Sequence, residues 1–373
     1  MSVPMTPPAG ASRYELEQVW LSASERLLDW DDSFHELLLG DRIRMRAFQA
    51  AIEEVVRPGM TVLDLGTGTG ILAEWALKNG AARVYGLELN QDILATAVER
   101  VGTAGYGASF KPIQGMSLDV TLPEAVDVIV SETLGNLADN EGMVEILDDA
   151  RRRFLAPGGR MIPSRVESYL VPVAAERAHT LVSTCTVADV DPGDWLSRVK
   201  MHGARDQFDV YYDAVLPRSS HLASARVARR YDLDRANDAM YSETLTWTVH
   251  DAGPLTGFKG YFIATLSPTV TLDISGDDPG SGARDTRTSS DSWKHCYLPI
   301  ANPVLVCRDD RIRLELTRAA RPDRPFQQAY HWKGAVLRGR TTIATFSNRH
   351  HPRSSGQPHG LDTRSATELG VPL

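Results

Sequence analysis

The pattern of apolar positions changes twice along the chain. From Tyr14 to about Val56, apolar residues recur at three- and four-residue spacing, which predicts helices. Between residues 61 and 162, short apolar runs alternate with helical periodicity, as in a parallel sheet with helices on both faces. Beyond Pro163, β-branched and aromatic residues alternate with polar ones, which predicts antiparallel strands. We therefore expect an α/β fold followed by a β domain.

The expected elements follow from these runs. In the first half, strands are expected at 61–65, 83–87, 109–114, 125–130 and 160–162. Helices are expected at 71–79, 91–100 and 143–154, the second of them with Asn90 as its N-cap. In the second half, strands are expected at 168–172, 242–250, 257–267, 297–307, 312–317 and 329–337. Residues 174–225 fit neither pattern.

Composition and charge narrow the class of function. The 373 residues carry a net charge of −8, and residues 1–163 hold 14 Lys and Arg against 24 Asp and Glu. Residues 308–353 are basic instead, with 11 against 4. A nucleic-acid-binding protein of this size is more often basic overall, so we expect no nucleic-acid partner. The acidic half suits a cationic substrate, although a solvated acidic surface is the commoner cause of such an imbalance.

The cysteines and the apolar runs bear on cellular location. Cys185, Cys296 and Cys307 are far apart and lack C-x-x-C spacing, which argues against a disulfide framework and a zinc site. No apolar run approaches the roughly 18 residues of a membrane-spanning helix, and residues 1–10 lack the features of a secretory signal. We expect a cytoplasmic protein with no bound metal and no membrane contact.

A glycine loop is the strongest local signal for a ligand. Gly66, Gly68 and Gly70 lie between the first expected strand and a helix, so backbone N–H groups can approach a ligand closely. A dinucleotide site would have the pattern G-x-G-x-x-G, whereas Ile71 stands where the third glycine would be. The loop therefore argues against hydride transfer and leaves either another ligand or a plain turn.

Carboxylates near this loop favour S-adenosylmethionine. Asp64 suits the positively charged amino end of this cofactor, and Glu88, at the tip of the second strand, suits its ribose hydroxyls.

Two further glutamates lie near the same edge of the expected sheet. Glu132 follows the strand at 125–130, at an edge where open α/β folds bind ligands. Glu141 lies nine residues further on. Paired carboxylates match a guanidinium best, although two Glu at this spacing are usually unrelated.

Several ordered motifs resemble the protein arginine methyltransferase (PRMT) family, from about residue 35 to the end of the β domain. They include the glycine loop, the helix segment 35–44, and Glu132 and Glu141 at the spacing of the family's double-E loop. Residues 257–262 resemble the family's G-F-x-x-x-F strand, and residues 292–294 its T-H-W loop. The resemblance implies S-adenosylmethionine as cofactor, S-adenosylhomocysteine as its product and an arginine guanidinium as methyl acceptor.

Carried over by position, the resemblance assigns roles to individual residues. Arg44 would pair with the cofactor carboxylate, and Glu88 with the ribose hydroxyls. Glu132 and Glu141 would clamp the guanidinium beside Trp293, so that the nitrogen away from the clamp can attack the sulfonium methyl group. Further expected cofactor contacts are Asp64, Gly66, Gly68, Gly70, Met116 and Asp119. Further expected substrate contacts are Ser292, Asn136, Met143 and Leu38, of which the last two lie where the family controls methyl number, and we expect monomethylation.

The resemblance also implies a division of the chain. Residues 1–56 would form a tail and helices that close the cofactor site, and residues 57–163 a Rossmann-like class I methyltransferase domain. Residues 164–353 would form an antiparallel β-barrel-like substrate domain with a dimerisation arm at about 174–225, so we expect a homodimer. Residues 354–373 would form a disordered tail.

The chain departs from the family pattern around the substrate. Ser292 replaces the His of T-H-W, so the family's His–Asp pair with Asp41 cannot form, and His295 could replace it. Polar residues stand in the double-E loop where the family has aromatic ones, at Thr133, Asn136, Asp139 and Asn140. A polar mouth, with Lys294 and His295 near Trp293, suits the ammonium and carboxylate of a free amino acid.

We therefore favour free L-arginine, methylated in bacterial natural-product biosynthesis, over a protein arginine as substrate. Two other classes stay open. A class I methyltransferase acting on an amine or hydroxyl would not need two clamping glutamates. A PRMT-like binding module without activity is favoured by the altered T-H-W loop, whereas both glutamates and the glycine loop favour an enzyme.

Overall fold

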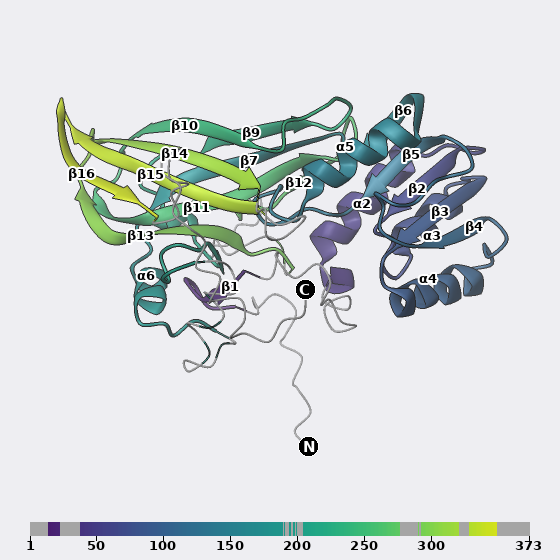
Figure 1. The fold of residues 1–373 in the computed structure, drawn as a ribbon, viewed down its shortest axis with the longest axis horizontal. Helices are drawn as coiled ribbons and strands as arrows, with labels where there is room; N and C mark the ends of the chain where they lie inside the picture. Colours follow the sequence, from purple (N-terminus) through teal and green to yellow (C-terminus); the bar gives the residue numbers. More distant parts are fainter. Residues whose placement is uncertain are drawn as a thin grey trace, which may run out of the picture.

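The computed structural model has two regions that differ in sheet type (Figure 1). It describes residues 14–22, 38–188, 190, 194, 197, 199, 204–276, 290, 292–320 and 328–348. A parallel sheet with its helices lies at one end of the elongated molecule, and two antiparallel sheets lie towards the other. The expected combination of an α/β fold with an antiparallel β fold is confirmed. The predicted tail at 354–373 lies outside the described residues.

Five parallel strands form the first sheet, in the order β4, β3, β2, β5 and β6. Their bounds are β2 Thr61–Leu65, β3 Arg83–Glu88, β4 Phe110–Gln114, β5 Val126–Ser131 and β6 Leu155–Ile162. The central strands β2 and β5 are almost wholly buried, which accounts for their apolar composition. The chain adds strands to one side of β2 and then returns to the other side with β5. The carboxyl ends of β2 and β5 therefore flank a topological switch point, where such sheets bind ligands.

Among the described residues, four helices accompany this sheet: α2 Arg42–Val55, α3 Ile71–Lys78, α4 Gln91–Thr103 and α5 Met143–Phe154. The predicted N-cap of α4 is confirmed, since the Asn90 side chain accepts two backbone N–H bonds. Asp41 caps α2 in the same way. Helices α3 and α5 instead begin after Gly70 and Gly142, which have φ of 81° and 71°. None of the helices in the described part of the chain is long and apolar enough to cross a membrane.

The second region consists of two antiparallel sheets. The larger has the order β1, β8, β13, β11, β7, β9, with β12 also paired to β11. Its strands are β1 Val19–Leu21, β7 Arg165–Val173, β8 Tyr212–Ala214, β9 Arg226–Asp232, β11 Gly253–Thr265, β12 Thr271–Asp273 and β13 His295–Val306. The smaller is β10 Tyr241–Thr248, β14 Arg311–Ala320, β15 Gln328–Arg338 and β16 Thr341–Ser347, in that order. Phe258 of β11 packs against Trp247 and Phe346 of the smaller sheet, with ring centroids 5.6 and 5.7 Å apart, so the sheets share one core.

The N-terminal segment differs from its predicted structure. We expected helical periodicity from Tyr14 onwards, but Val19–Leu21 form strand β1, which pairs with β8. Val19 and Leu21 are buried while Trp20 between them is half-buried, as in a strand. The free edge of β8 supplies backbone partners, and this tertiary pairing overrides a local pattern that suits a helix equally well.

The segment 174–225 and three further strands also differ from what the sequence pattern predicts. The segment contains α6 Glu176–Ser183, strand β8 and a 3-10 turn at Arg218–Ser220 among its described residues. Strands β9, β12 and β16 were not predicted. The sequence of β9, RVARRYD, has so many charged residues that an alternation of apolar and polar positions is hard to see. Strand β12 has only three residues, and most residues of β16 are exposed.

Close packing in the smaller sheet gives a test of this fold. A Cβ added at Gly334 of β15 would overlap the carbonyl oxygen of Arg313 and the ring of Phe346. We expect Gly334→Ala to lower the free energy of unfolding by about 2 kcal/mol, because the carbonyl oxygen of Arg313 is part of the backbone of β14 and cannot move away without disturbing the sheet. Gly102→Ala, with nothing within 4 Å of the added Cβ, is the matched control and should not lose stability. Equal urea midpoints for the two variants would contradict this packing.

Candidate active site

A pocket of about 370 Å³ opens at the carboxyl edge of the parallel sheet. The loops after β2, β3, β4 and β5 all contribute to it, through residues 66–69, 88–90, 115–117 and 132–133. Arg44, Met45 and Phe48 of α2 line another side, with Leu38 and Leu39 before that helix. The pocket therefore lies between the carboxyl edge of the parallel sheet, where a ligand is expected, and helix α2, which is expected to close the site.

The glycine loop forms one wall of the pocket and is held by backbone bonds. The N–H groups of Gly66 and Thr67 both donate to the carbonyl oxygen of Leu87, at 2.9 Å each. Gly66, Gly68 and Gly70 have positive φ, and a Cβ at Gly70 would lie 2.9 Å from the Cβ of Ala97 in α4. Glycine is therefore required here for both backbone conformation and close packing.

Glu88 lies at the tip of β3 and lines the pocket. Its carboxylate accepts N–H bonds from Leu89, Asn90 and, across the pocket wall, Gly68, at 2.9, 3.0 and 3.0 Å. A carboxylate has about four lone-pair sites, so this side chain keeps acceptor capacity for a hydroxyl of a ligand.

Asp64 differs from its predicted place. It is fully buried beneath the glycine loop and does not line the pocket. Its Oδ2 accepts bonds from the Thr67 hydroxyl at 2.6 Å and the Ala73 N–H at 2.9 Å, and Oδ1 has no partner among the described residues. Burial raises the pKa of Asp64 to about 7, while these two bonds act in the opposite direction. Asp64 thus holds the loop in place from below.

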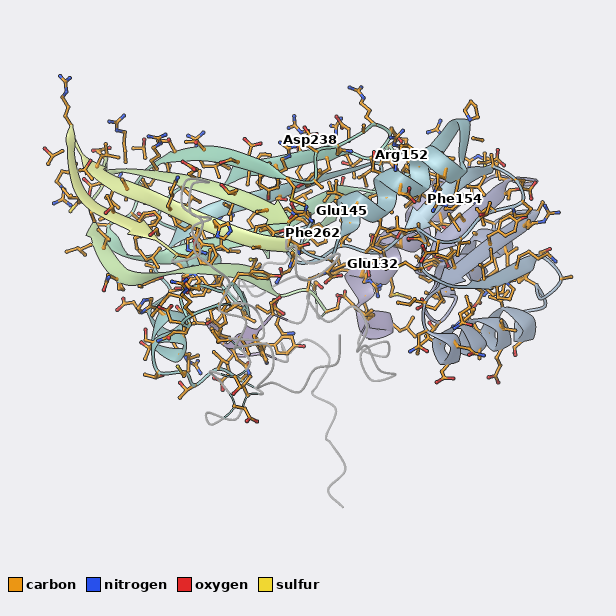
Figure 2. The ribbon with its side chains drawn as sticks, in the orientation of Figure 1. Glu132, Glu145, Arg152, Phe154, Asp238 and Phe262 are labelled. Carbon is orange, nitrogen blue, oxygen red and sulfur yellow. The ribbon has the colours of Figure 1, made fainter. Side chains whose placement is uncertain are left out.

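Arg44, Glu132 and Trp293 meet beside the pocket. Arg44 donates from Nη2 to Oε2 of Glu132, and its guanidinium lies 5.6 Å from the centre of the Trp293 ring. Both side chains of the ion pair are mostly buried. Figure 2 shows Glu132 at the junction between the parallel sheet and the antiparallel strands. A carboxylate and an aromatic ring therefore already surround one guanidinium at this point.

The loop from β5 to α5 carries both predicted catalytic glutamates. Glu132 begins it, and the half-buried Glu141 ends it, just before Gly142. Glu132 lines the 370 Å³ pocket and Glu141 does not. Between them, the Asn140 side chain accepts from the Leu137 N–H at 2.9 Å and donates to Oδ1 of Asn136, also at 2.9 Å. These bonds give the loop one compact shape.

The T-H-W-like loop is joined to α2 through Asp41. The Oδ2 atom of Asp41 accepts from the Ser290 hydroxyl, and from the N–H and hydroxyl of Ser292 at 3.0 and 2.7 Å. Ser290 in turn accepts the Trp293 N–H at 2.9 Å. Since Oδ1 of the same carboxylate caps α2, one side chain couples the helix of Arg44 to the loop of Trp293.

Serine hydroxyls, and not His295, therefore take the place of the family histidine. His295 is fully buried, where its Nδ1 accepts the Leu216 N–H at 3.1 Å and its Nε2 lies 3.1 Å from the carbonyl oxygen of Ser275. Burial lowers the pKa of His295 well below its ordinary value, and nearby Lys259 acts in the same direction. A neutral His295 that donates from Nε2 satisfies both bonds.

The remaining predicted residues divide into two groups. Leu38, Met116, Gly66 and Gly68 line the pocket with Arg44 and Glu88. Gly70, Asp119, Asn136, Met143, Ser292 and Trp293 do not. Asp119 is exposed, and Met143 is fully buried in the core. Residues that line the pocket without having been predicted include Thr67, Thr69, Asn90, Ser117 and Ile146. The first four follow strand ends, a position that could have identified them.

Two protein-family models match the chain, one over the region of the parallel sheet and one over the region of the antiparallel sheets. A model of a methyltransferase domain matches residues 62–159. A model of the PRMT5 oligomerisation domain matches residues 165–341. The first region is thus of methyltransferase type. With the relatives below, the second match makes the chain a relative of the protein arginine methyltransferases, and the family resemblance seen in its motifs is confirmed.

Individual relatives carry the same family name. The ribosomal protein arginine N-methyltransferase rmt3 of Schizosaccharomyces pombe is 27% identical over 314 residues, 81% of this chain and 56% of that protein. Protein arginine N-methyltransferase PRMT10 of Oryza sativa subsp. japonica is 37% identical over 154 residues, 40% of each chain. The chain therefore spans about half or less of the length of these relatives.

Solved structures show the same fold. Arabidopsis thaliana protein arginine methyltransferase 10 matches with a TM-score of 0.67 at 21% identity, over 84% of this chain and 96% of that one. The Trypanosoma brucei PRMT1 enzyme–prozyme complex with AdoHcy matches with a TM-score of 0.69 at 20% identity, over 85% of this chain and 100% of that one. These likenesses extend across both regions.

The raised pKa of Asp64 predicts a specific pH dependence. The folded chain keeps this proton up to about pH 7, whereas an unfolded Asp loses it near its ordinary pKa, so stability falls as the pH rises through this range. The amide of Asp64→Asn does not titrate, so this variant does not lose stability as the pH rises. The free energy of unfolding of the variant minus that of wild type should therefore be larger at about pH 8 than at about pH 5. Urea unfolding at both pH values measures this, and a difference that does not change with pH would rule out a protonated Asp64.

Proposed function

We propose that this chain is an S-adenosylmethionine-dependent N-methyltransferase that acts on a guanidino nitrogen of arginine. The contact of a guanidinium, that of Arg44, with Glu132 beside Trp293 carries this proposal. The same surroundings suit the guanidinium of a substrate. A methyltransferase for an amine or hydroxyl would not need this pairing, and a binding module would not need a cofactor pocket next to it.

The residues around the pocket fit S-adenosylmethionine. Glu88 has acceptor capacity for the ribose hydroxyls, the glycine loop presents its backbone closely, and Arg44 supplies a cation for the carboxylate. When bound, this cofactor supplies an electrophilic methyl group. Asp64 is left out of this set because it is buried beneath the loop.

The chain's own part in the reaction is to bind and orient the guanidinium. Its pKa lies above about 12, so removing its proton beforehand is costly at neutral pH. Two carboxylates, Glu132 and Glu141, can hold the positive charge toward one side of the group, which leaves the lone pair of the far nitrogen available for attack. That nitrogen would take the methyl group as the methyl–sulfur bond breaks with its electron pair on sulfur, and the proton that it loses would pass to a clamp carboxylate or to water. Trp293 covers the aliphatic part of the substrate, and its Nε1 is fixed by a bond of 2.7 Å to the carbonyl oxygen of Leu134.

We propose free L-arginine, in a biosynthetic pathway, as the favoured substrate. The structure narrows the support for this, because Asn136, Asp139 and Asn140 are buried and do not form an open polar mouth. The support that is left is Lys294, next to Trp293 in sequence, whose ammonium lies 4.6 and 4.8 Å from the rings of Tyr14 and Trp20. A cation at this place could pair with the carboxylate of a free amino acid.

Protein arginine is the second candidate substrate. The names of the relatives favour it, since they describe enzymes that act on ribosomal protein or protein arginine.

We further propose a homodimer in the cytoplasm, with the segment 174–225 as its arm. The match to an oligomerisation-domain model supports the dimer. The division at residue 163 and the predicted monomethylation also stay proposals.

Removing either carboxylate tests the guanidinium clamp. We expect Glu132→Gln and Glu141→Gln each to lower kcat by about 100-fold or more, because each removes a charge that should stabilise the reacting group. The dissociation constant of S-adenosylhomocysteine should change little for Glu141→Gln. Glu99→Gln, an exposed position on α4, is the matched control. Turnover within about tenfold of wild type for both variants would show that no such clamp operates.

Product mass distinguishes the two substrates. Wild-type chain is incubated with S-adenosylmethionine and either free L-arginine or an arginine-rich protein, and the products are analysed by mass spectrometry. We expect a mass increase of one methyl group on free arginine, because in this proposal the Lys294 ammonium pairs with the carboxylate of that substrate. Methylation of the protein alone would overturn the free-arginine proposal and leave the methyltransferase proposal standing.

A further inference from the structure

A buried arginine lies behind the loop that carries the two glutamates. Arg318 of β14 is among the largest fully buried side chains of the described chain. Its Nη1 donates to Oε1 of Glu145 at 2.9 Å, and its Nη2 donates to the carbonyl oxygen of Asp139 at 3.0 Å. Nη2 also lies 3.1 Å from Oε1 of Gln328. One guanidinium thus bonds the loop, helix α5 and strand β15.

Asp139 is the charge partner of Arg318 inside the loop. Its side chain is fully buried, and Oδ2 lies 3.5 Å from Nε of Arg318. The hydroxyls of Tyr231 in β9 and Tyr330 in β15 both donate to its carboxylate. Strands of both antiparallel sheets therefore converge on one loop residue.

Two carboxylates, those of Asp139 and Glu145, face the single guanidinium of Arg318 and favour its charged form. Burial alone disfavours a charged guanidinium, but Tyr330, Asp139 and Glu145 raise the pKa of Arg318 above its ordinary value. Burial also raises the pKa of Tyr231 and Tyr330, so both stay hydroxyl donors. A buried ion pair with this many bonds tolerates the loss of one partner poorly, because the other charge is left uncompensated.

Two of the groups that Arg318 bonds lie on either side of Glu141 in the sequence. The carbonyl oxygen of Asp139 lies two residues before it, and the carboxylate of Glu145 lies in the first turn of α5, four residues after it. A planar guanidinium can hold both groups at fixed separation, which a single ammonium cannot do. The backbone that carries Glu141 is therefore fixed on both sides from β14.

We propose that Arg318 is a positioning residue that sets the place of the Glu141 carboxylate relative to Glu132. This rests on the proposed function, in which the two carboxylates hold one guanidinium. Glu132 lies at the end of a strand of the parallel sheet, whereas Glu141 depends on a loop. A shift of the loop by about 1 Å would misplace one half of the clamp and leave the cofactor pocket unchanged.

Two variants and a matched control test the proposal. Arg318→Lys keeps the charge but cannot hold both groups. Glu145→Gln weakens only the bond to α5, at a side chain that is 30% exposed and so is tolerant of change. Arg313→Gln alters an exposed arginine five residues earlier on the same strand. The readouts are kcat, the KM of S-adenosylmethionine, the KM of whichever arginine substrate wild type methylates, and the dissociation constant of S-adenosylhomocysteine.

We expect Arg318→Lys to lower kcat by about tenfold or more and to raise the KM of the arginine substrate, with smaller changes of the same kind in Glu145→Gln. Binding of S-adenosylhomocysteine should stay within about twofold of wild type, which a general loss of structure would not allow. Values of kcat and KM equal to those of Arg313→Gln in both variants would overturn the proposal. Where Arg318→Lys does not fold, Glu145→Gln decides between the two results.

Hydrogen exchange separates this proposal from the proposed function. In Arg318→Lys and Glu145→Gln, amide exchange should become faster for residues 135–142 and stay unchanged for β5. Unchanged exchange at 135–142 in both variants would overturn the positioning role. Wild-type chain that methylates no guanidine would overturn the proposed function instead, and the exchange result would still decide whether Arg318 orders the loop.

Discussion

The site depends on one constraint: the loop that begins at β5 of the parallel sheet takes its shape from the antiparallel sheets. Side chains from β7, β8, β9, β14 and β15 all bond to it, and Trp293 adds a further bond. The bonds are Ser168 to Leu137, Asn136 to Asp213, Tyr231 and Tyr330 to Asp139, Arg318 to Asp139, and Trp293 to Leu134. The parallel sheet alone would leave this loop with few partners, so the second region is part of the site.

A second coupling runs through Asp41. Its carboxylate caps α2 and accepts bonds from the serines beside Trp293, so the cofactor side and the substrate side of the site share one group. Arg44 then follows in the first turn of α2 and reaches Glu132. In the family pattern a histidine partners this aspartate, and here two hydroxyls satisfy the same acceptor. The exchange replaces an imidazole with neutral hydroxyl donors.

Much of this arrangement could be predicted from sequence, and the misses have physical causes. Helix α5 and the Asn90 cap were predictable because periodicity and capping are local signals. Strand β1 was not, because its pairing with β8 is between segments distant in sequence. Asp64 was assigned to the cofactor since its position along the chain does not show which way a buried side chain points. The polar residues of the double-E loop suggest a solvent-facing mouth when only the sequence is considered, whereas Asp139 is in fact buried against partners from distant strands, Arg318 above all.

A structure of the chain with S-adenosylhomocysteine and an arginine substrate would show where the guanidinium lies relative to Glu132 and Glu141. We expect the carboxylates of Glu132 and Glu141 each to lie within about 3 Å of a guanidinium nitrogen of the substrate. We also expect the bonds of Arg318 to Asp139 and Glu145 to persist in that complex. A guanidinium bound away from Glu141, or held by Glu132 alone, would contradict the proposed clamp.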